Sequence, residues 1–292
     1  MPNNLRIRAP AKLNLHLRVF SPAESGRKDG YHNIESVLQA VDLYDELTVR
    51  KTAENGTCRL EVNGMELPAR NTLTAAYTEF CNLTGVSEGV HLVLTKRIPA
   101  GAGLGGGSSD AAAFLTLLDK LFHTELTLKQ RLYAASRIGS DVAFFLSHGC
   151  AVVTGRGELI REIEARTDIF FVLVQPDVHS STKEAYALLD ERMNCPQTKL
   201  FPPEADLENI YRGPVCNWTF VNSFTEPLTE SYPVIGRALD AVKACGAVFA
   251  DMTGAGSMVY GVFASEAEAK NAYTQLCGAW RTFLVRPCTA FA

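Results

Sequence analysis

The sequence predicts an α+β protein with two domains, and three observations support this fold class. The chain has 292 residues, enough for about two domains of ~100–200 residues each. Its composition, 47% hydrophobic and 21% charged, is that of a globular protein. Strand and helix patterns are mixed along the chain without the regular strand–helix–strand order of a doubly wound sheet. We place the domain boundary near residue 160, which predicts domains over 1–160 and 161–292.

Most of the first third is predicted as strands. Apolar and polar residues alternate with period two over four segments, residues 5–20, 45–52, 58–64 and 90–98. Helical spacing interrupts them over 71–85, where Gly85 closes the helix. An alanine- and leucine-rich segment predicts a largely buried helix over 110–122. A second helix follows over 126–139, with Gly139 at its C-terminal end, and 149–163 returns to strand.

The second half is predicted to begin with a buried strand over 168–178. The patterns then predict two helices over 181–193 and 227–246. Residues 247–265 read as two strands around a glycine turn, and a helix and a strand complete the chain over 266–280 and 281–287.

Charge and cysteine usage narrow the class of protein. The formal net charge of -4 provides no global basic field that would attract nucleic acid or an anionic membrane. No apolar run approaches the ~18–20 residues of a membrane span, and the N-terminal segment alternates instead of resembling a signal peptide. The eight cysteines form no C-x-x-C pair and the six histidines have no ligand spacing. These features predict a cytoplasmic enzyme with free thiols, without a structural metal, and with neither nucleic acid nor membrane as a partner.

A glycine-rich run, GAGLGGGSSDAAAFL over 101–115, is the strongest local signal. A flexible linker is disfavoured, because the run leads directly into an apolar helix. Gly101, Gly103 and Gly106 satisfy the dinucleotide pattern G-x-G-x-x-G, but a second helix follows where that fold requires a strand. A Walker A loop would need a G-K-[ST] ending, and the run has none.

Phosphate binding is the interpretation that remains. Glycines let successive backbone N–H groups approach an oxyanion, and a helix that begins near Ser108 to Asp110 adds its positive N-terminal end. Ser108 and Ser109 offer hydroxyl groups to phosphate oxygens or to a magnesium ion. A simpler alternative is a helix N-cap at Ser108 or Ser109 behind a turn, which explains one serine but not five glycines.

The segment from Pro99 to Ala111 resembles the phosphate-binding motif of the GHMP small-molecule kinases. PAKLNLHL over 10–17 resembles the N-terminal strand of that superfamily, and MTGAGSMVYG over 252–261 resembles its C-terminal glycine loop. The resemblance implies a two-domain GHMP kinase fold. Its N-terminal, ATP-binding domain would be similar to domain 2 of ribosomal protein S5 and its C-terminal domain ferredoxin-like, with ATP and substrate in the cleft between them.

Five segments resemble one branch of the superfamily, which acts on a cytidine diphosphate-linked methylerythritol in non-mevalonate isoprenoid biosynthesis. They are APAKLNL over 9–15, DGYHNIES over 29–36, GLGGGSSDA over 103–111, GSDVAFFL over 139–146 and QPDVHSSTKEAY over 175–186. The resemblance implies ATP-dependent phosphorylation of the 2-hydroxyl of that substrate. Two alternatives remain open: a GHMP kinase of the homoserine or mevalonate type, and a non-catalytic relative that only binds nucleotide.

The resemblance assigns catalysis to Lys12 and Asp141. Asp141 would orient the hindered hydroxyl and accept its proton, and Lys12 would keep Asp141 ionised. Without the resemblance, the local patterns predict a helix N-cap for Asp141 and a solvent-facing position for Lys12. Ser140 and Ala143 replace residues common in the family, and both changes leave Asp141 in place.

The resemblance also assigns the binding residues. His32 would read the cytosine edge, Tyr31 and Tyr186 would stack on its faces, and other substrate contacts are expected from Asn14, Thr182, Gly254 and Gly256. The segment 179–186 lacks a proline often found after the threonine, which affects the expected position of Tyr186. Arg27 and Lys28 are expected to be exposed.

ATP and Mg²⁺ are the expected cofactors, and a monomer or weak homodimer the expected assembly. The predicted ATP-binding residues are Pro99, Ala100, Gly101, Ala102, Gly103, Leu104, Gly105, Gly106, Gly107, Ser108 and Ser109 for the phosphates, with Lys96 and Asn71 on the adenosine side. Of these, Ser108 and Ser109 are the candidate magnesium ligands.

Overall fold

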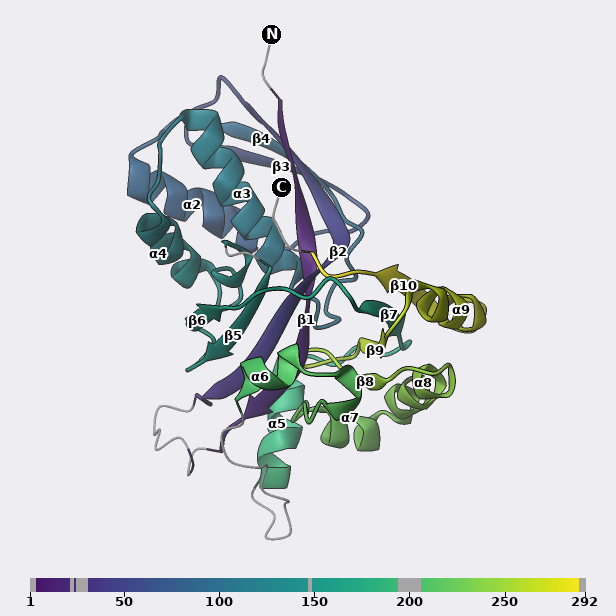
Figure 1. The fold of residues 1–292 in the computed structure, drawn as a ribbon. Helices are drawn as coiled ribbons and strands as arrows, with labels where there is room; N and C mark the ends of the chain where they lie inside the picture. The colour runs from purple at the N-terminus through teal and green to yellow at the C-terminus, as the bar shows by residue number, and fades with distance from the viewer. Residues whose placement is uncertain (1–3, 22–23, 25–30, 147–148, 194–205, 289–292) are drawn as a thin grey trace.

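The computed structural model describes residues 4–21, 24, 31–146, 149–193 and 206–288, and shows two halves, each built on one β-sheet (Figure 1). The first sheet is 6-stranded, in the order β3-β4-β2-β5-β6 with β1 paired to β2; the second is 4-stranded, in the order β10-β7-β9-β8. Arg27 and Lys28, expected to be exposed, lie outside the described residues. The boundary near residue 160 stays a prediction.

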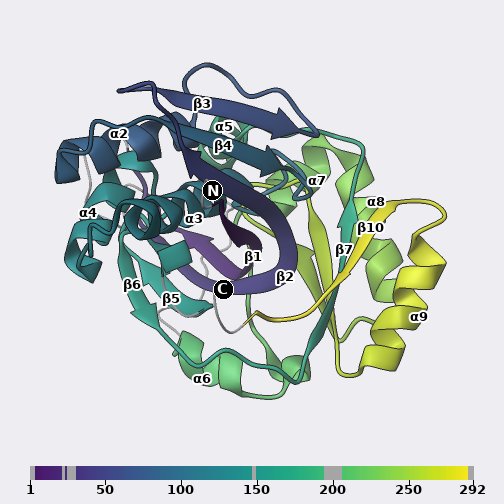
Figure 2. The same cartoon turned by 90° about the horizontal axis from the view of Figure 1, so that it is seen from above.

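A long antiparallel pair forms the centre of the first half. It consists of β1 (Leu5–Val19) and β2 (Ile34–Lys51), which pair from Leu5 opposite Val49 to Val19 opposite Ile34. The pairing shifts between Pro10 and Ala11 and again between Asn14 and His16, where β-bulges interrupt the regular ladder. Seen from above, β2 is strongly curved (Figure 2). Strand β2 therefore borders both halves of the molecule, contacting β10 as well as β4 and β5.

The remaining strands and helices of this half complete two layers. The strands are β3 (Cys58–Asn63), β4 (Val90–Thr95), β5 (Cys150–Thr154) and β6 (Leu159–Glu162), and the helices are α2 (Thr72–Thr84), α3 (Gly106–Phe122), α4 (Leu128–Ile138) and the short 3-10 turn η1 (Phe144–Leu146). Helix α3 packs on β1 and β2, and α2 and α4 pack against α3 on the same side (Figure 1). An apolar core between helices and sheet holds this layer together.

The second half is built on an antiparallel sheet, and two of its helices pack on one face of that sheet. Its strands are β7 (Phe170–Gln175), β8 (Phe249–Met252), β9 (Val259–Phe263) and β10 (Arg281–Val285), and its helices are α5 (Thr182–Met193), α6 (Leu207–Arg212), α7 (Thr225–Ser231), α8 (Pro233–Ala244) and α9 (Glu266–Leu276), with the 3-10 turn η2 (Val215–Asn217). Val172 and Val174 of β7 pack with α8 and α9, whereas Phe171 and Leu173 face the core shared with β1.

The structure differs from the sequence prediction at four main points. The strand predicted over 149–163 is two paired strands, β5 and β6, and helix α6 was not predicted. The strand predicted over 45–52 begins already at Ile34, because residues 36–41 are buried on both faces and lose the alternation that marks a half-exposed strand. The single helix predicted over 227–246 is two helices, α7 and α8. Pro233 disfavours a helical conformation at Tyr232 and takes the first position of α8.

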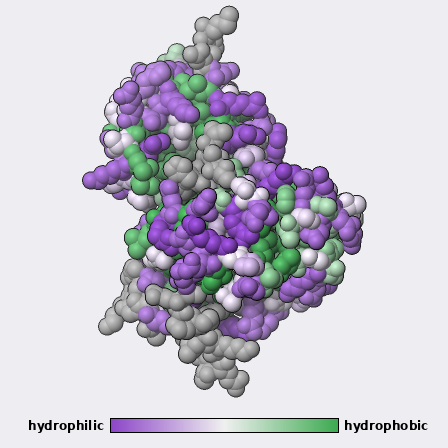
Figure 3. All heavy atoms as spheres, in the orientation of Figure 1, coloured by the Kyte–Doolittle hydropathy of each residue, from purple (hydrophilic) through white to green (hydrophobic). Residues whose placement is uncertain are grey.

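The described residues include no helix long and apolar enough to cross a membrane. The seven cysteines that the structure describes are free thiols. Hydrophilic side chains cover most of the face shown in Figure 3, with apolar side chains scattered among them.

Candidate active site

A cavity of about 550 Å³ lies where the two halves meet. One wall comes from the first half and contains Lys12, Asp141 and the glycine-rich run. The opposite wall comes from the second half and contains Thr182, Tyr186 and Gly254. Residues far apart in the sequence therefore share one cavity of a size suited to a small-molecule ligand.

The glycine-rich run forms a loop that ends at the start of α3. Gly101, Gly103 and Gly105 have positive φ angles of 64°, 78° and 69°, a backbone conformation that residues with a Cβ rarely adopt. Helix α3 begins at Gly106 and no side chain caps it. Its first N–H groups and the positive end of its dipole are thus available to an anion in the cavity.

The serines of the run have different environments, and neither is the N-cap. The cap is Gly105, so the helix begins before the Ser108–Asp110 start that the sequence suggested. Ser108 lines the cavity. Ser109 is buried, and its hydroxyl has no hydrogen-bond partner among the described residues. Of the two serines, Ser108 is therefore the one placed to contact a phosphate or a metal ion.

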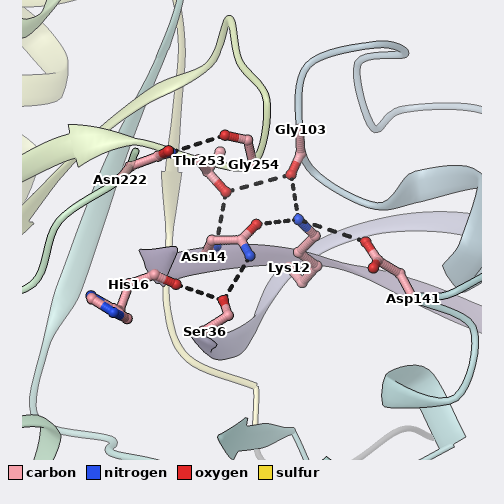
Figure 4. A network of polar contacts seen from close by, with 9 residues as sticks. All are labelled: Lys12, Asn14, His16, Ser36, Gly103, Asp141, Asn222, Thr253 and Gly254. Carbon is pink, nitrogen blue, oxygen red and sulfur yellow. Dashed lines mark hydrogen bonds and ion pairs between the residues drawn. The ribbon is translucent and has the colours of Figure 1, made fainter. Parts of the chain in front are cut away.

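Lys12 occupies the centre of the polar network drawn in Figure 4. Its Nζ donates to the carbonyl oxygen of Gly103 at 2.8 Å and to Oδ1 of Asn14, and lies 3.8 Å from Oδ2 of Asp141. Only 3% of Lys12 is exposed, so the solvent-facing position that its strand pattern alone predicts is wrong. Burial lowers the pKa of Lys12 from its ordinary value, and the nearby Asp141 carboxylate opposes this shift in part.

The polar face of β1 is buried because the glycine-rich loop covers Lys12 and residues of the second half contact Asn14 and His16. The side chains of Lys12, Asn14, His16 and Arg18 alternate with buried leucines along the strand, and all four are themselves buried. Asn14 is fixed in orientation: its Nδ2 donates to Ser36 Oγ at 2.9 Å, and Ser36 in turn donates to the carbonyl of His16 at 2.5 Å (Figure 4). Asn14 Oδ1 is thereby held toward Lys12.

The predicted substrate residues are only partly brought together. Asn14, Thr182, Tyr186 and Gly254 line the cavity, whereas Tyr31, His32 and Gly256 do not. His32 stacks on Tyr186, with ring centroids 5.4 Å apart, and its Nδ1 and Nε2 lie 2.9 Å and 3.0 Å from the Phe20 carbonyl and Asp190 Oδ1. Both ring nitrogens of His32 therefore already face acceptors of the protein.

Tyr31 and Gly256 lie outside this group. Tyr31 is 59% exposed, and the guanidinium of Arg156 lies 4.8 Å from its ring centroid. Gly256 belongs to the loop between β8 and β9, where its neighbour Gly254 alone of the two contributes to the cavity wall.

The two residues predicted for the adenosine side have structural partners. Lys96 lines the cavity, but its Nζ donates to Asp110 Oδ2 at 2.8 Å and to Asp45. Carboxylates on two sides outweigh burial and raise the pKa of Lys96. Asn71 caps α2 by accepting from the backbone N–H groups of Leu73 and Thr74, and it does not line the cavity.

Three residues of the site network were missed in the sequence. Thr253 accepts a hydrogen bond from the Asn14 backbone, Asn222 donates to the carbonyl oxygens on either side of Thr253, and Ser36 orients Asn14. Thr253 lies inside the MTGAGSMVYG segment and Ser36 ends DGYHNIES, so attention to hydroxyls in these motifs would have found both. No local pattern marks Asn222.

Comparison with known families shows which family the chain matches. The family described as GHMP kinases N terminal domain matches residues 71–149, and GHMP kinases C terminal matches residues 201–282. This chain belongs to the GHMP kinase family. The kinase fold expected from the sequence is thus confirmed, with its glycine-rich run in the first matched region and the loop between β8 and β9 in the second.

Individual members of the GHMP kinase family are similar over nearly their whole length. The chain is 39% identical to the 4-diphosphocytidyl-2-C-methyl-D-erythritol kinase of Treponema pallidum, over 95% of this chain and 96% of the relative. It is 38% identical to the kinase of the same name from Pseudothermotoga lettingae, over 89% and 92% of the two chains.

Solved structures place the chain in the same part of the GHMP kinase family. The crystal structure of a 4-(cytidine 5'-diphospho)-2C-methyl-D-erythritol kinase superimposes with a TM-score of 0.82 at 28% identity, covering 98% of this chain and 100% of the other. A homoserine kinase from Cytophaga hutchinsonii superimposes with a TM-score of 0.66 at 17% identity, over 99% and 96% of the two chains. The latter likeness shows the shared GHMP kinase fold alone.

Proposed function

We propose that this GHMP kinase transfers the γ-phosphoryl group of ATP to the 2-hydroxyl of 4-diphosphocytidyl-2-C-methyl-D-erythritol. Two relatives that carry the name of this kinase are similar over nine tenths or so of their length, and a solved structure with that name superimposes over all of its chain. The observation that carries the proposal is the pair of Lys12 and Asp141, 3.8 Å apart in the wall of the cavity that the glycine loop borders.

The residues support this chemistry as follows. Asp141 accepts the proton of the attacking hydroxyl, whose oxygen forms the new bond to the γ-phosphorus. The bond from the γ-phosphorus to the β–γ bridging oxygen breaks, and ADP leaves. Lys12 neutralises charge that develops on the phosphoryl oxygens. The N-terminal N–H groups of α3 bind the phosphates of ATP.

Mg²⁺ fits the site as an ion held mainly by ATP. The described residues contain no group of three or more His, Cys, Asp or Glu side chains that would hold a metal ion. Magnesium bound to phosphates needs only one or two protein oxygens, and the Ser108 hydroxyl in the cavity wall is one. When bound, the ion would neutralise phosphate oxygens of ATP. The cytoplasmic location and the monomeric or weakly dimeric state stay predictions.

ADP release measured with three acceptors tests the proposed substrate. We expect turnover with the cytidine-linked methylerythritol, and none with homoserine or mevalonate. Turnover with homoserine or mevalonate in place of the cytidine compound would assign a different GHMP kinase activity. No turnover with any of them, despite ATP binding, would favour a non-catalytic relative.

Asp141→Asn tests the assigned base. It keeps the size of the side chain and removes the proton acceptor, so turnover is expected to fall by ~10²-fold or more while a non-hydrolysable ATP analogue still binds. Asp240→Asn, on the exposed face of α8, is the matched control and should leave turnover unchanged. Near-wild-type turnover in Asp141→Asn would reject Asp141 as the base.

A further inference from the structure

The loop between β8 and β9 contacts the glycine-rich loop through backbone atoms. A Cβ added to Gly103 would lie 2.1 Å from the carbonyl oxygen of Thr253, closer than any real contact. In the other direction, a Cβ on Gly254 would lie 3.0 Å from the Cα of Gly103. The two loops come from different halves of the protein, so this contact fixes the phosphate-binding loop against the second half.

Thr253 stands at the centre of this contact, and its hydroxyl joins three segments. It accepts the backbone N–H of Asn14 at 2.8 Å and lies 3.4 Å from the carbonyl oxygen of Gly103, to which it donates (Figure 4). The side chain is completely buried. The Asn14 N–H is available to Thr253 beside the β-bulge at which β1 shifts its pairing with β2.

The carbonyl of Gly103 links Thr253 to Lys12. This oxygen accepts from both the Thr253 hydroxyl and the Lys12 ammonium, the latter at 2.8 Å. A carbonyl oxygen has two lone pairs, so both are used. The backbone N–H of Lys12 also donates to the carbonyl of Leu104 at 2.9 Å. The position of the Lys12 ammonium thus depends on a loop that Thr253 holds from the other side.

Asn222 holds Thr253 itself. Its Nδ2 donates to the carbonyl oxygens of Met252 and Gly254, at 2.7 Å and 2.9 Å, and its Oδ1 accepts the N–H of Phe224 at 2.9 Å. The amide is therefore fixed in orientation, and it clamps the backbone immediately before and after Thr253. The Thr253 side chain has little freedom to turn away from Asn14 and Gly103.

We propose that Thr253 is a positioning residue for phosphoryl transfer, whose hydroxyl holds the Gly103 carbonyl and the Asn14 backbone so that the Lys12 ammonium faces Asp141. The inference rests on the proposed function for its kinetic readout. Thr253 contacts the groups that hold Lys12 but does not line the cavity. We therefore expect a variant without the Thr253 hydroxyl to slow the chemical step more than it weakens the binding of either substrate.

Thr253→Val and Thr253→Ser separate the hydroxyl from the shape of the side chain. Valine keeps the shape and removes the hydroxyl, which leaves the buried Asn14 N–H without an acceptor. We expect kcat to fall roughly 10-fold to 10²-fold, the scale of a small misplacement of catalytic groups, with KM for ATP within about threefold of wild type. Thr253→Ser keeps the hydroxyl and should retain kcat within about threefold of wild type on the same argument.

Thr116→Val is the matched control, because its hydroxyl bonds to Ala112 within α3 and lies outside the cavity. An unchanged kcat in Thr253→Val would overturn the inference, and so would an equal loss in Thr253→Ser. If Thr253→Val fails to fold, Thr253→Ala takes its place with the same expectations.

A second readout distinguishes failure of this inference from failure of the proposed function. Hydrogen exchange of peptides that cover 101–105, measured with a bound non-hydrolysable ATP analogue, needs no phosphoryl acceptor. Exchange should be faster in Thr253→Val than in wild type and unchanged in Thr253→Ser. Equal exchange in all three proteins would overturn the inference, even if the wild type phosphorylates a different acceptor. If the wild type shows no turnover but exchange over 101–105 is faster in Thr253→Val as expected, only the proposed function is contradicted.

Discussion

Lys12 Nζ lies 3.8 Å from Asp141 Oδ2, and the two side chains differ sharply in exposure: 4% of the lysine side chain is accessible, against 40% of the aspartate. The ammonium is thus held inside the protein, with its carboxylate partner at the edge of the cavity where a substrate hydroxyl can reach it. A buried cation beside an accessible base suits a reaction in which the base meets the substrate and the cation stays in place.

The first prediction concerns alkaline pH. Because burial lowers the pKa of Lys12, kcat/KM should decline with rising pH at a midpoint below the ordinary lysine value of 10.5. Between the lowered pKa and 10.5 the unfolded chain binds the proton that the native protein has lost, so the contribution of Lys12 to stability rises with pH. Activity and this stability contribution should therefore change in opposite directions.

A pH–rate profile and urea unfolding of wild type and Lys12→Met check both parts. The free energy of unfolding of wild type should increase relative to that of Lys12→Met as the pH rises toward 10.5. A kcat/KM that stays constant up to that pH would show that charged Lys12 is not required.

The second prediction concerns acid. Burial, with a smaller contribution from Arg18, lowers the pKa of His16 from 6.5 to about 4. Its Nδ1 accepts the Val221 N–H at 3.2 Å, which requires an unprotonated nitrogen, and Nε2 lies 4.0 Å from Glu35 Oε2. Between pH 6.5 and 4 the unfolded chain binds the proton and the native protein does not, so stability is lost as the pH falls through this window.

His16→Asn should remove this loss, because its side-chain oxygen can still accept the Val221 N–H but does not titrate. From pH 7 to pH 4, wild type is expected to lose up to about 3 kcal/mol more stability than His16→Asn in urea unfolding. Equal losses in the two proteins would contradict the prediction.

The third prediction concerns the buried group of Lys96, Asp45 and Asp110. Burial, aided by the Asp45 carboxylate and opposed by Lys96, raises the pKa of Asp110 to about 7. Lys96→Met would leave two buried carboxyl groups without their cation, so the free energy of unfolding should drop by about 3–5 kcal/mol. Adding Asp110→Asn removes one of these carboxyl groups and should restore part of the loss.

Urea unfolding of the single and double variants measures the effect. Lys129→Met, on the exposed side of α4, serves as the control and should change stability by no more than about 0.5 kcal/mol. A loss for Lys96→Met no greater than that of the control would show that the three side chains contribute little to folding.

The fourth prediction concerns the predicted base-binding cluster. Tyr186 lines the cavity and packs between His32 and Phe224. The ring centroids of Tyr186 and Phe224 lie 4.9 Å apart. If it stacks on the cytosine, Tyr186→Leu should raise KM for the cytidine substrate by about 10-fold, in line with ~1–3 kcal/mol for stacking on a base. Steady-state kinetics should show KM for ATP unchanged. An unchanged KM for the cytidine substrate would place the base elsewhere, and Tyr133→Leu, at an exposed position on α4, is the control.

Much of the fold could be predicted because its local signals are strong. Alternation identified the short strands and helical spacing identified α2, α3, α4, α5 and α9, apart from small differences at their ends. The first part of β2 was missed because both of its faces are buried: Leu38 and Ala40 pack into one core, and Val37 and Val41 into another. Alternation of apolar and polar residues marks a strand with one face exposed to solvent, and this segment has no exposed face.

The site, like the fold, could be predicted only in part from the sequence. The motifs predicted five site residues that the structure places in one cavity: Lys12, Asn14, Asp141, Tyr186 and Gly254. They did not reveal that Lys96 is paired with Asp45 and Asp110, because that pairing joins the interior of β2, the residue after β4 and the first turns of α3. Nor did they reveal Thr253 as the contact of Gly103, because two loops meet there from different halves.

The sequence by itself determined the fold of a GHMP kinase through its family motifs, and it predicted a phosphate-binding glycine loop, because glycine conformation and helix N-termini are local properties. Only the tertiary structure decided that the polar face of β1 is buried. The alternation along this strand is the same whether that face meets water or another domain, and the sequence pattern alone favours water. The glycine-rich loop covers Lys12 and holds it opposite Asp141, and residues of the second half contact Asn14 and His16 of the same strand.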